Sequence, residues 1–180
     1  MSIDKPFWNR LDIASLDGAD KTGNLGAVLL ASCPGLRAHS TATDSDIKDD
    51  VERLAAAGAD FVLSLIEADD RTRLGVTALD DMIAAVGLEN ASFPIRDHGV
   101  PPKEQTTELE QLLDGVEARI RNGKTIVIHC QAGLGRTGMI AGILLRRFGI
   151  DGETAIKTIR QIRLGSIETS AQEDFVKGWG

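Results

Sequence analysis

The sequence predicts an α/β fold: a single domain with a central, mostly parallel sheet of four to five strands flanked by helices. Short apolar runs alternate with amphipathic stretches of helical spacing along most of the chain, and only helical stretches follow the last apolar run. Such alternation is typical of helices that connect parallel strands. A chain of 180 residues, 42% of them hydrophobic, is long enough to bury one core without disulfides or metals.

Four short runs are expected to form strands, and the first of them is expected to be buried. The first, 27–31, is followed by the turn-forming sequence Cys33-Pro34-Gly35. The last, 125–128, is rich in β-branched residues and apolar on both faces, which indicates a central strand. The other two runs are 61–66 and 91–95.

Helices are expected between and after these strands. The first begins after a cap at Thr43 or Asp44 and ends before Gly58. The full set of expected helices is 44–57, 77–86, 103–121, 137–148, 152–163 and 169–178. Residues 1–24 are expected to be a lead-in with a short edge strand, packed on the domain formed by residues 25–180.

The composition limits the partners that the chain can have. Its formal net charge is −7, so it has no general attraction for nucleic acid or an anionic membrane. No apolar run approaches the length of a membrane span, and the N-terminal segment lacks the apolar core of a signal peptide. We therefore expect a cytoplasmic monomer that needs a local positive field to bind an anionic substrate.

The segment 129–138, HCQAGLGRTG, predicts a site for a phosphate group. It joins the expected central strand to a helix through a Gly-rich loop, and backbone N–H groups at such a helix start bind anions. The residues expected to line the loop are Gln131, Ala132, Gly133, Leu134, Gly135 and Arg136. Arg136 follows Cys130 by six positions and can grip two phosphate oxygens with its planar guanidinium.

Cys130 is the expected nucleophile at the floor of this loop. The N–H donors and the helix dipole favour its thiolate form, which attacks phosphorus. The hydroxyl of Thr137 is expected to donate to the sulfur, and His129 to orient the loop through hydrogen bonds. The alternative is a buried structural cysteine followed by an incidental turn. Cys33, the second cysteine, is read as a small core residue, with a regulatory disulfide to Cys130 as the alternative.

These residues resemble the signature of the protein tyrosine phosphatase superfamily, and in particular its dual-specificity type. A longer similarity, from about residue 25 to 175, is to the kinase-associated phosphatase (cyclin-dependent kinase inhibitor 3) group. The resemblance implies the cysteine phosphatase fold and a reaction through a phosphocysteine intermediate. It also implies a general acid on a separate loop, which the stretch 94–101 matches with Asp97 in the acid position. His98 is the rival acid.

The resemblance further assigns Gln172 to the neighbourhood of the hydrolytic water, with a surface glutamine as the alternative. Gln131 and Leu134 are uncharged where lipid phosphatases of the superfamily carry lysines, so the expected substrate is a phosphorylated protein or peptide. Phosphate, sulfate or vanadate is expected to bind the same loop. No cofactor or metal is expected, since His39, His98 and His129 are scattered.

Three other functions remain open at this point. The first is a phosphatase of inositol phosphates or other small molecules that uses the same mechanism. The second is a non-catalytic module that binds phosphorylated partners, although such a protein usually lacks the cysteine, the arginine or the acid. The third is arsenate reduction or sulfur transfer on a similar anion loop.

Overall fold

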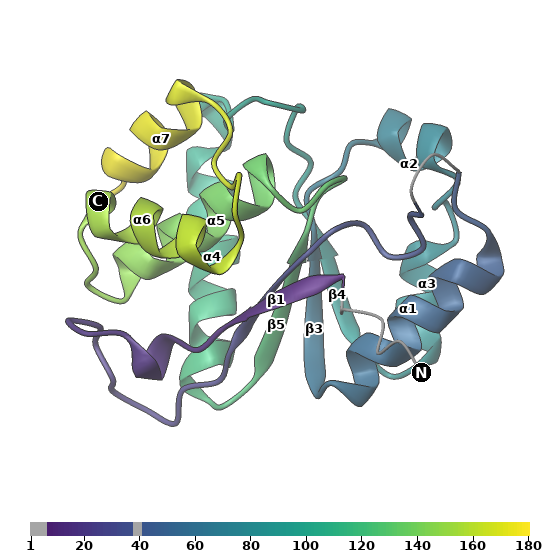
Figure 1. The fold of residues 1–180 in the computed structure, drawn as a ribbon, viewed down its shortest axis with the longest axis horizontal. Helices are drawn as coiled ribbons and strands as arrows, with labels where there is room; N and C mark the ends of the chain where they lie inside the picture. Colours follow the sequence, from purple (N-terminus) through teal and green to yellow (C-terminus); the bar gives the residue numbers. More distant parts are fainter. Residues whose placement is uncertain (1–6, 38–40) are drawn as a thin grey trace.

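The computed structural model describes residues 7–37 and 41–180, so His39 and the first six residues of the expected lead-in lie outside it. One five-stranded sheet separates two groups of helices (Figure 1). Helices α1, α2 and α3 lie on one side of the sheet, and α4, α5, α6 and α7 on the other. This arrangement confirms the predicted fold class.

The sheet has the order β1-β2-β5-β3-β4, and every pair of neighbours is parallel except β1 and β2. Its strands are β1 (Trp8–Leu11), β2 (Val28–Ala31), β3 (Ala59–Ser64), β4 (Glu89–Ser92) and β5 (Thr125–His129). β5 is central and all five of its residues are buried, as its apolar sequence predicts. The expected edge strand in the lead-in is β1, which pairs with β2 in antiparallel register.

The helices match their expected positions within a few residues. They are α1 (Asp44–Ala56), α2 (Ala68–Leu74), α3 (Leu79–Ala85), α4 (Thr106–Arg121), α5 (Gly135–Arg147), α6 (Gly152–Ile162) and α7 (Ser170–Lys177). Short 3₁₀ turns occupy Ile13–Ser15 and Lys103–Gln105, so the expected helix at 103–121 begins with a tighter turn. Helix α2, seven residues between Glu67 and Gly75, is not among the helices that the sequence predicts.

Helix α5 joins the loop after β5 to the interior of the domain. Every residue from Gly135 to Leu145 is buried, whereas the other long helices bury a single face. It packs on β2 and β5 and is covered by α6 and α7. A helix that is enclosed all round fixes its own N-terminus, and therefore the start of the loop that precedes it, in one position.

The carboxyl ends of the central strands meet at one edge of the sheet. The registers bring His129 of β5 beside Ala31 of β2 and Ser64 of β3. In open α/β sheets, ligands bind in the crevice outside this edge. The loop that follows His129 is therefore in the position where this fold class builds its sites.

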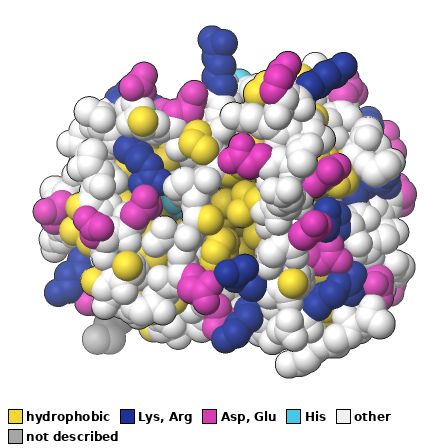
Figure 2. Space-filling model, turned by 180° about the vertical axis from the view of Figure 1, so that it is seen from behind, with side chains coloured by type: hydrophobic (Ala, Val, Ile, Leu, Met, Phe, Trp, Pro, Cys, Tyr) yellow, Lys and Arg dark blue, Asp and Glu magenta, His cyan; other side chains and the backbone are white. Residues whose placement is uncertain are grey.

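The face of the molecule drawn in Figure 2 carries charges of both signs. Figure 2 shows Lys and Arg interspersed with Asp and Glu over the face opposite to that of Figure 1, with hydrophobic side chains in a central hollow. Among the described residues, no helix combines the length and the apolar character needed to cross a membrane. The mixture of signs on this face does not form the basic stripe that a nucleic acid would need.

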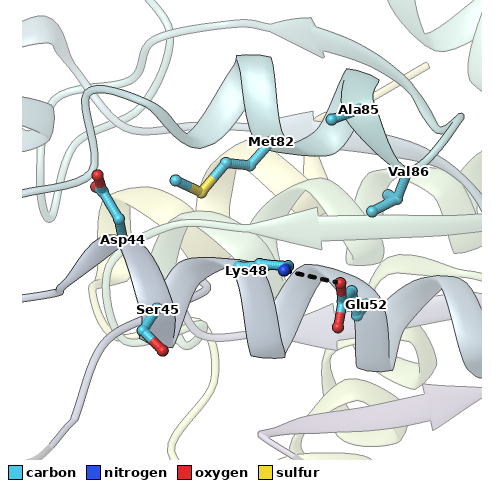
Figure 3. Close-up of a pocket in the computed structure, with 7 residues that line it drawn as sticks. All are labelled: Asp44, Ser45, Lys48, Glu52, Met82, Ala85 and Val86. Carbon is cyan, nitrogen blue, oxygen red and sulfur yellow. Dashed lines mark ion pairs between the residues drawn. The ribbon is translucent and has the colours of Figure 1, made fainter.

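A hollow of about 450 Å³ lies between α1 and α3, and none of its lining residues belongs to the loop after β5 (Figure 3). Met82, Ala85 and Val86 form one wall of it, and an ion pair between Lys48 and Glu52 crosses the other. Neither a cysteine nor a histidine lines this hollow. The chemistry expected from the sequence belongs to the loop after β5.

Candidate active site

The loop at 130–135 curls around the sulfur of Cys130. Cys130 is buried, and its Sγ accepts a hydrogen bond from the N–H of Gly133 at 3.3 Å. Within the described residues, the N–H groups of Gln131, Ala132 and Leu134 donate to no other group of the protein. The loop thus has three unpaired N–H donors in the residues that follow the sulfur, at the positive end of the helix α5.

Gly133 is the position where the loop tolerates no side chain. Its φ is 73°, in the left-handed region, and a Cβ there would lie 2.3 Å from the carbonyl oxygen of Ala31. The loop is also tied to the chain after β2, because the N–H of Cys33 donates to the carbonyl of Gln131 at 2.9 Å. The curled loop therefore rests against the end of β2.

Arg136 places its guanidinium inside the protein. The side chain is 1% exposed, and its Nη1 donates to the Asp70 carboxylate and to the carbonyl of Ile95, each at 3.0 Å. The Nε and Nη2 atoms have no hydrogen-bond partner among the described residues. Nη2 lies 3.0 Å from Oδ1 of Asp97, an ion pair without hydrogen-bond alignment. Burial opposes the charge of Arg136, but these carboxylates and Cys130 outweigh it and raise its pKa.

Asp70 is a residue of the site that sequence reasoning missed. It comes from α2, is buried, and is shared between Arg136 and the more exposed Arg73 of the same helix. Burial raises the pKa of this carboxyl, but the hydrogen bonds from Arg136 and Arg73 outweigh it and hold the pKa below its ordinary value. The run Asp69-Asp70-Arg71, preceded by a capping Glu67 and ended by Gly75, was the signal that could have predicted α2.

The expected acid loop lies across from Cys130 and is held by α7. Asp97 is half exposed and pairs with Arg136, as described above. The next residue, His98, has a φ of 57°, which a residue with a side chain seldom adopts. Thr169 donates from its hydroxyl to the carbonyl of His98 at 3.4 Å, and Gln172 from its amide to the carbonyl of Gly99 at 3.2 Å.

Gln172 is fully buried, which excludes the alternative of a surface glutamine. Its Oε1 accepts the N–H of Glu168 at 2.9 Å while its Nε2 donates to the acid loop. A Cβ at Gly135 would lie 3.0 Å from this Oε1, so Gln172 also lies directly beside the start of α5. The side chain links the acid loop, the segment before α7 and the loop around Cys130.

His129 is a buried, neutral histidine beneath the loop. Its Nδ1 bonds to the carbonyl of Cys130 at 3.2 Å. Burial lowers the pKa of His129 to about 4, so the neutral ring donates from Nδ1 to that carbonyl at neutral pH. This bond is of the orienting kind that the sequence predicts for His129.

Two further expected contacts are not present in the described part of the chain. The hydroxyl of Thr137 is buried and has no hydrogen-bond partner, so its donation to the sulfur of Cys130 stays a prediction. Cys33 and Cys130 are both free thiols. Burial raises the pKa of Cys33 to about 12, which makes it a poor nucleophile, and its expected alternative role in a disulfide also stays a prediction.

A family model described as "Swiss Army Knife protein, DSP-PTPase phosphatase domain" matches residues 36–176. The chain belongs to this phosphatase family. The chain is also 27% identical over 134 residues to cyclin-dependent kinase inhibitor 3 of Sus scrofa. That alignment covers 73% of this chain and 62% of the relative, so the chain spans less than two thirds of the length of that curated relative.

Two solved structures support the same assignment of fold. The crystal structure of kinase associated phosphatase with its catalytic-site cysteine replaced by serine aligns at a TM-score of 0.82 and 21% identity, over 96% of this chain and 93% of that one. The crystal structure of Tk-PTP in its active form aligns at a TM-score of 0.66 and 26% identity, over 89% of this chain and 95% of that one. The resemblance to dual-specificity phosphatases and to the kinase-associated phosphatase group is thereby confirmed.

Replacing Asp70 tests its hold on the phosphatase loop. We expect Asp70→Asn to weaken phosphate binding about tenfold or more, because a hydrogen bond to a charged group contributes about 1.5–3 kcal/mol. Calorimetric titration with inorganic phosphate measures the affinity. Asp69→Asn, on the exposed neighbour in α2, is the matched control. Equal affinities for phosphate in the two variants would contradict the conclusion that Asp70 holds Arg136 in place for phosphate binding.

The buried His129 predicts a pH dependence of stability. Unfolded, His129 takes up a proton near its ordinary pKa of 6.5, whereas folded it stays neutral down to about 4. The unfolded chain therefore binds more protons in this window, and the free energy of unfolding falls as the pH drops from 6.5 towards 4.

Urea unfolding at several pH values measures this slope. His129→Asn is expected to flatten it, and His98→Asn, at an exposed histidine, to leave it as in the wild type. A slope as steep in His129→Asn as in the wild type would show that another group is responsible.

Proposed function

We propose that this phosphatase domain hydrolyses phosphomonoesters of phosphorylated proteins or peptides through a phosphocysteine intermediate formed on Cys130. The observation that supports this proposal best is the hydrogen bonding of the Arg136 guanidinium. One nitrogen, Nη1, is fixed by Asp70 and Ile95, while Nε and Nη2 remain free of hydrogen bonds beside the loop. Those two nitrogens are spaced to hold two phosphate oxygens.

In the first step, the thiolate of Cys130 attacks phosphorus and the ester oxygen leaves. The N–H groups of the loop and Arg136 hold the three phosphoryl oxygens during the transfer. Asp97 then has to reach the leaving oxygen with a proton. A phosphoryl group that takes Nη2 of Arg136 replaces the Asp97 carboxylate there. The released carboxylate takes up a proton from solvent, turns towards the leaving group and donates that proton to the ester oxygen.

In the second step, water attacks the phosphocysteine and Asp97 accepts the proton of that water. The thiolate of Cys130 leaves and inorganic phosphate is released. The amide of Gln172 is occupied by Gly99 and Glu168. We propose that Gln172 contributes by holding the acid loop in reach of Cys130, in addition to the role near the hydrolytic water that the family resemblance implies.

A small phosphorylated molecule with a second anionic group, such as an inositol phosphate, is the second candidate substrate. One observation favours it: Arg73, 54% exposed, donates to the side chain of Gln131 at 2.9 Å and adds a cation beside the loop. Against it stand the uncharged side chains of Gln131 and Leu134 in the loop itself. A panel of phosphotyrosine peptides, phosphothreonine peptides and inositol phosphates, compared by kcat/KM, separates the two candidates.

Removing the nucleophile tests the mechanism. Cys130→Ser is expected to abolish hydrolysis of p-nitrophenyl phosphate and to retain phosphate binding, because the hydroxyl is a far weaker nucleophile than the thiolate while the loop keeps its donors. Phosphate release and calorimetric titration measure the two properties. Cys33→Ser, at the other cysteine, is the control and is expected to remain active. Full turnover by Cys130→Ser would overturn the mechanism.

Removing the acid tests the role of Asp97. Asp97→Asn is expected to lower kcat about 10²- to 10⁴-fold on a phosphotyrosine peptide, because general acid catalysis typically contributes this much. The loss should be much smaller on an aryl phosphate whose leaving group needs no proton. His98→Asn is the matched control on the same loop. A larger loss in His98→Asn than in Asp97→Asn would make His98 the acid.

A further inference from the structure

Arg163 has a set of contacts that neither the proposed mechanism nor its place in the sequence accounts for. It follows the last residue of α6, and its side chain reaches three other segments. Nη2 donates to the carbonyl of Ala132 at 3.0 Å, and Nη1 to Oδ1 of Asn9 at 2.8 Å and to the carbonyl of Leu30 at 3.4 Å. One guanidinium thereby joins α6, the edge strand β1, the strand β2 and the loop around Cys130.

The charge of Arg163 is not neutralised by a carboxylate. Among the described residues it forms no ion pair, its partners are neutral oxygens, and its Nε is buried without a hydrogen bond. Burial lowers the pKa of Arg163, and among the described residues the charge of Cys130 opposes this effect. The cation is thus directed at neutral oxygens, one of which belongs to the loop around Cys130, and this points to a positioning task at the loop.

The contact with Ala132 acts on a single peptide unit. The carbonyl oxygen of Ala132 accepts from Arg163, and the N–H of the same peptide, on Gly133, donates to the sulfur of Cys130. A trans peptide is planar, and its C=O and N–H point in opposite directions. Holding the oxygen on the outer side of the loop therefore turns the N–H inward, towards the sulfur.

We propose that Arg163 is a positioning residue that fixes the Ala132–Gly133 peptide so that its N–H stabilises the Cys130 thiolate. The left-handed Gly133 makes this control necessary, because a glycine hinge permits the peptide to rotate. Asn9 and Leu30 fix the guanidinium by accepting hydrogen bonds from its other terminal nitrogen, Nη1. The inference rests on the proposed function in one respect only, that Cys130 reacts as a thiolate.

The pH dependence of alkylation of Cys130 by iodoacetamide tests the inference without turnover, with Cys130 followed by peptide mass spectrometry. The ionisable groups near the sulfur include Arg136, Arg163, Cys33 and His129. Asp70 and Asp97 lie beyond Arg136, Arg73 contacts Gln131 of the loop, Arg71 acts on Cys33 and His129, and Glu168 lies beside Gly135. In Arg163→Met the midpoint of the profile is expected to rise by about one pH unit, which is tenfold less thiolate below the midpoint. The value of kcat/KM at pH 6 should fall by a similar factor.

Arg146→Met is the matched control, because Arg146 also bonds backbone carbonyls, those of Ile150 and Trp179, and none of its contacts involves the loop. Its alkylation profile is expected to equal that of the wild type. A wild-type profile in folded Arg163→Met overturns the inference.

Arg163→Lys supplies the same comparison if the methionine variant does not fold. Lysine keeps the cation but lacks the planar fork that reaches Ala132 and Asn9 from two nitrogens, so a shift in the same direction is expected. A wild-type alkylation profile in this variant overturns the inference, because it would show that the positive charge alone stabilises the thiolate. Absence of hydrolysis by the wild type would refute the proposed function and still leave the alkylation comparison readable.

Discussion

Arg136 brings a positive charge into the interior of the domain, and an unpaired charge there would destabilise the fold by several kcal/mol. Asp70 supplies the opposite charge, and the carbonyl of Ile95 accepts a second bond from the same nitrogen. This pairing fixes one edge of the guanidinium and leaves the other edge for an anion. The same pairing ties α2, the beginning of the acid loop and the start of α5 to one another.

The chain has a formal net charge of −7, which opposes the binding of an anion at the site. Three arginines from distant parts of the sequence compensate locally: Arg136 within the loop, Arg73 on the side chain of Gln131, and Arg163 on the carbonyl of Ala132. Only the charges near the loop act strongly on a bound phosphoryl group, because more distant exposed charges are screened by salt. A net acidic domain can therefore bind an anion without general affinity for polyanions.

The sequence predicted the sheet, most helices and the loop because each of these is encoded locally. Apolar runs mark β2, β3 and β5, and the spacing from Cys130 to Arg136 marks the loop. It did not predict Asp70 or the role of Arg163, because the value of these side chains depends on contacts across more than 30 residues of chain. A short charged helix such as α2 also lacks the apolar periodicity that identifies longer helices.

The central claim is that one edge of Arg136 is fixed by Asp70 while the other holds a phosphoryl group over Cys130. A crystal structure with vanadate, which mimics the transferred phosphoryl group, tests it most directly. We expect vanadium bonded to Sγ of Cys130, two vanadate oxygens on Nε and Nη2 of Arg136, and Nη1 still on Asp70. Vanadate bound away from Cys130, or held through Nη1 with Asp70 displaced, would contradict it.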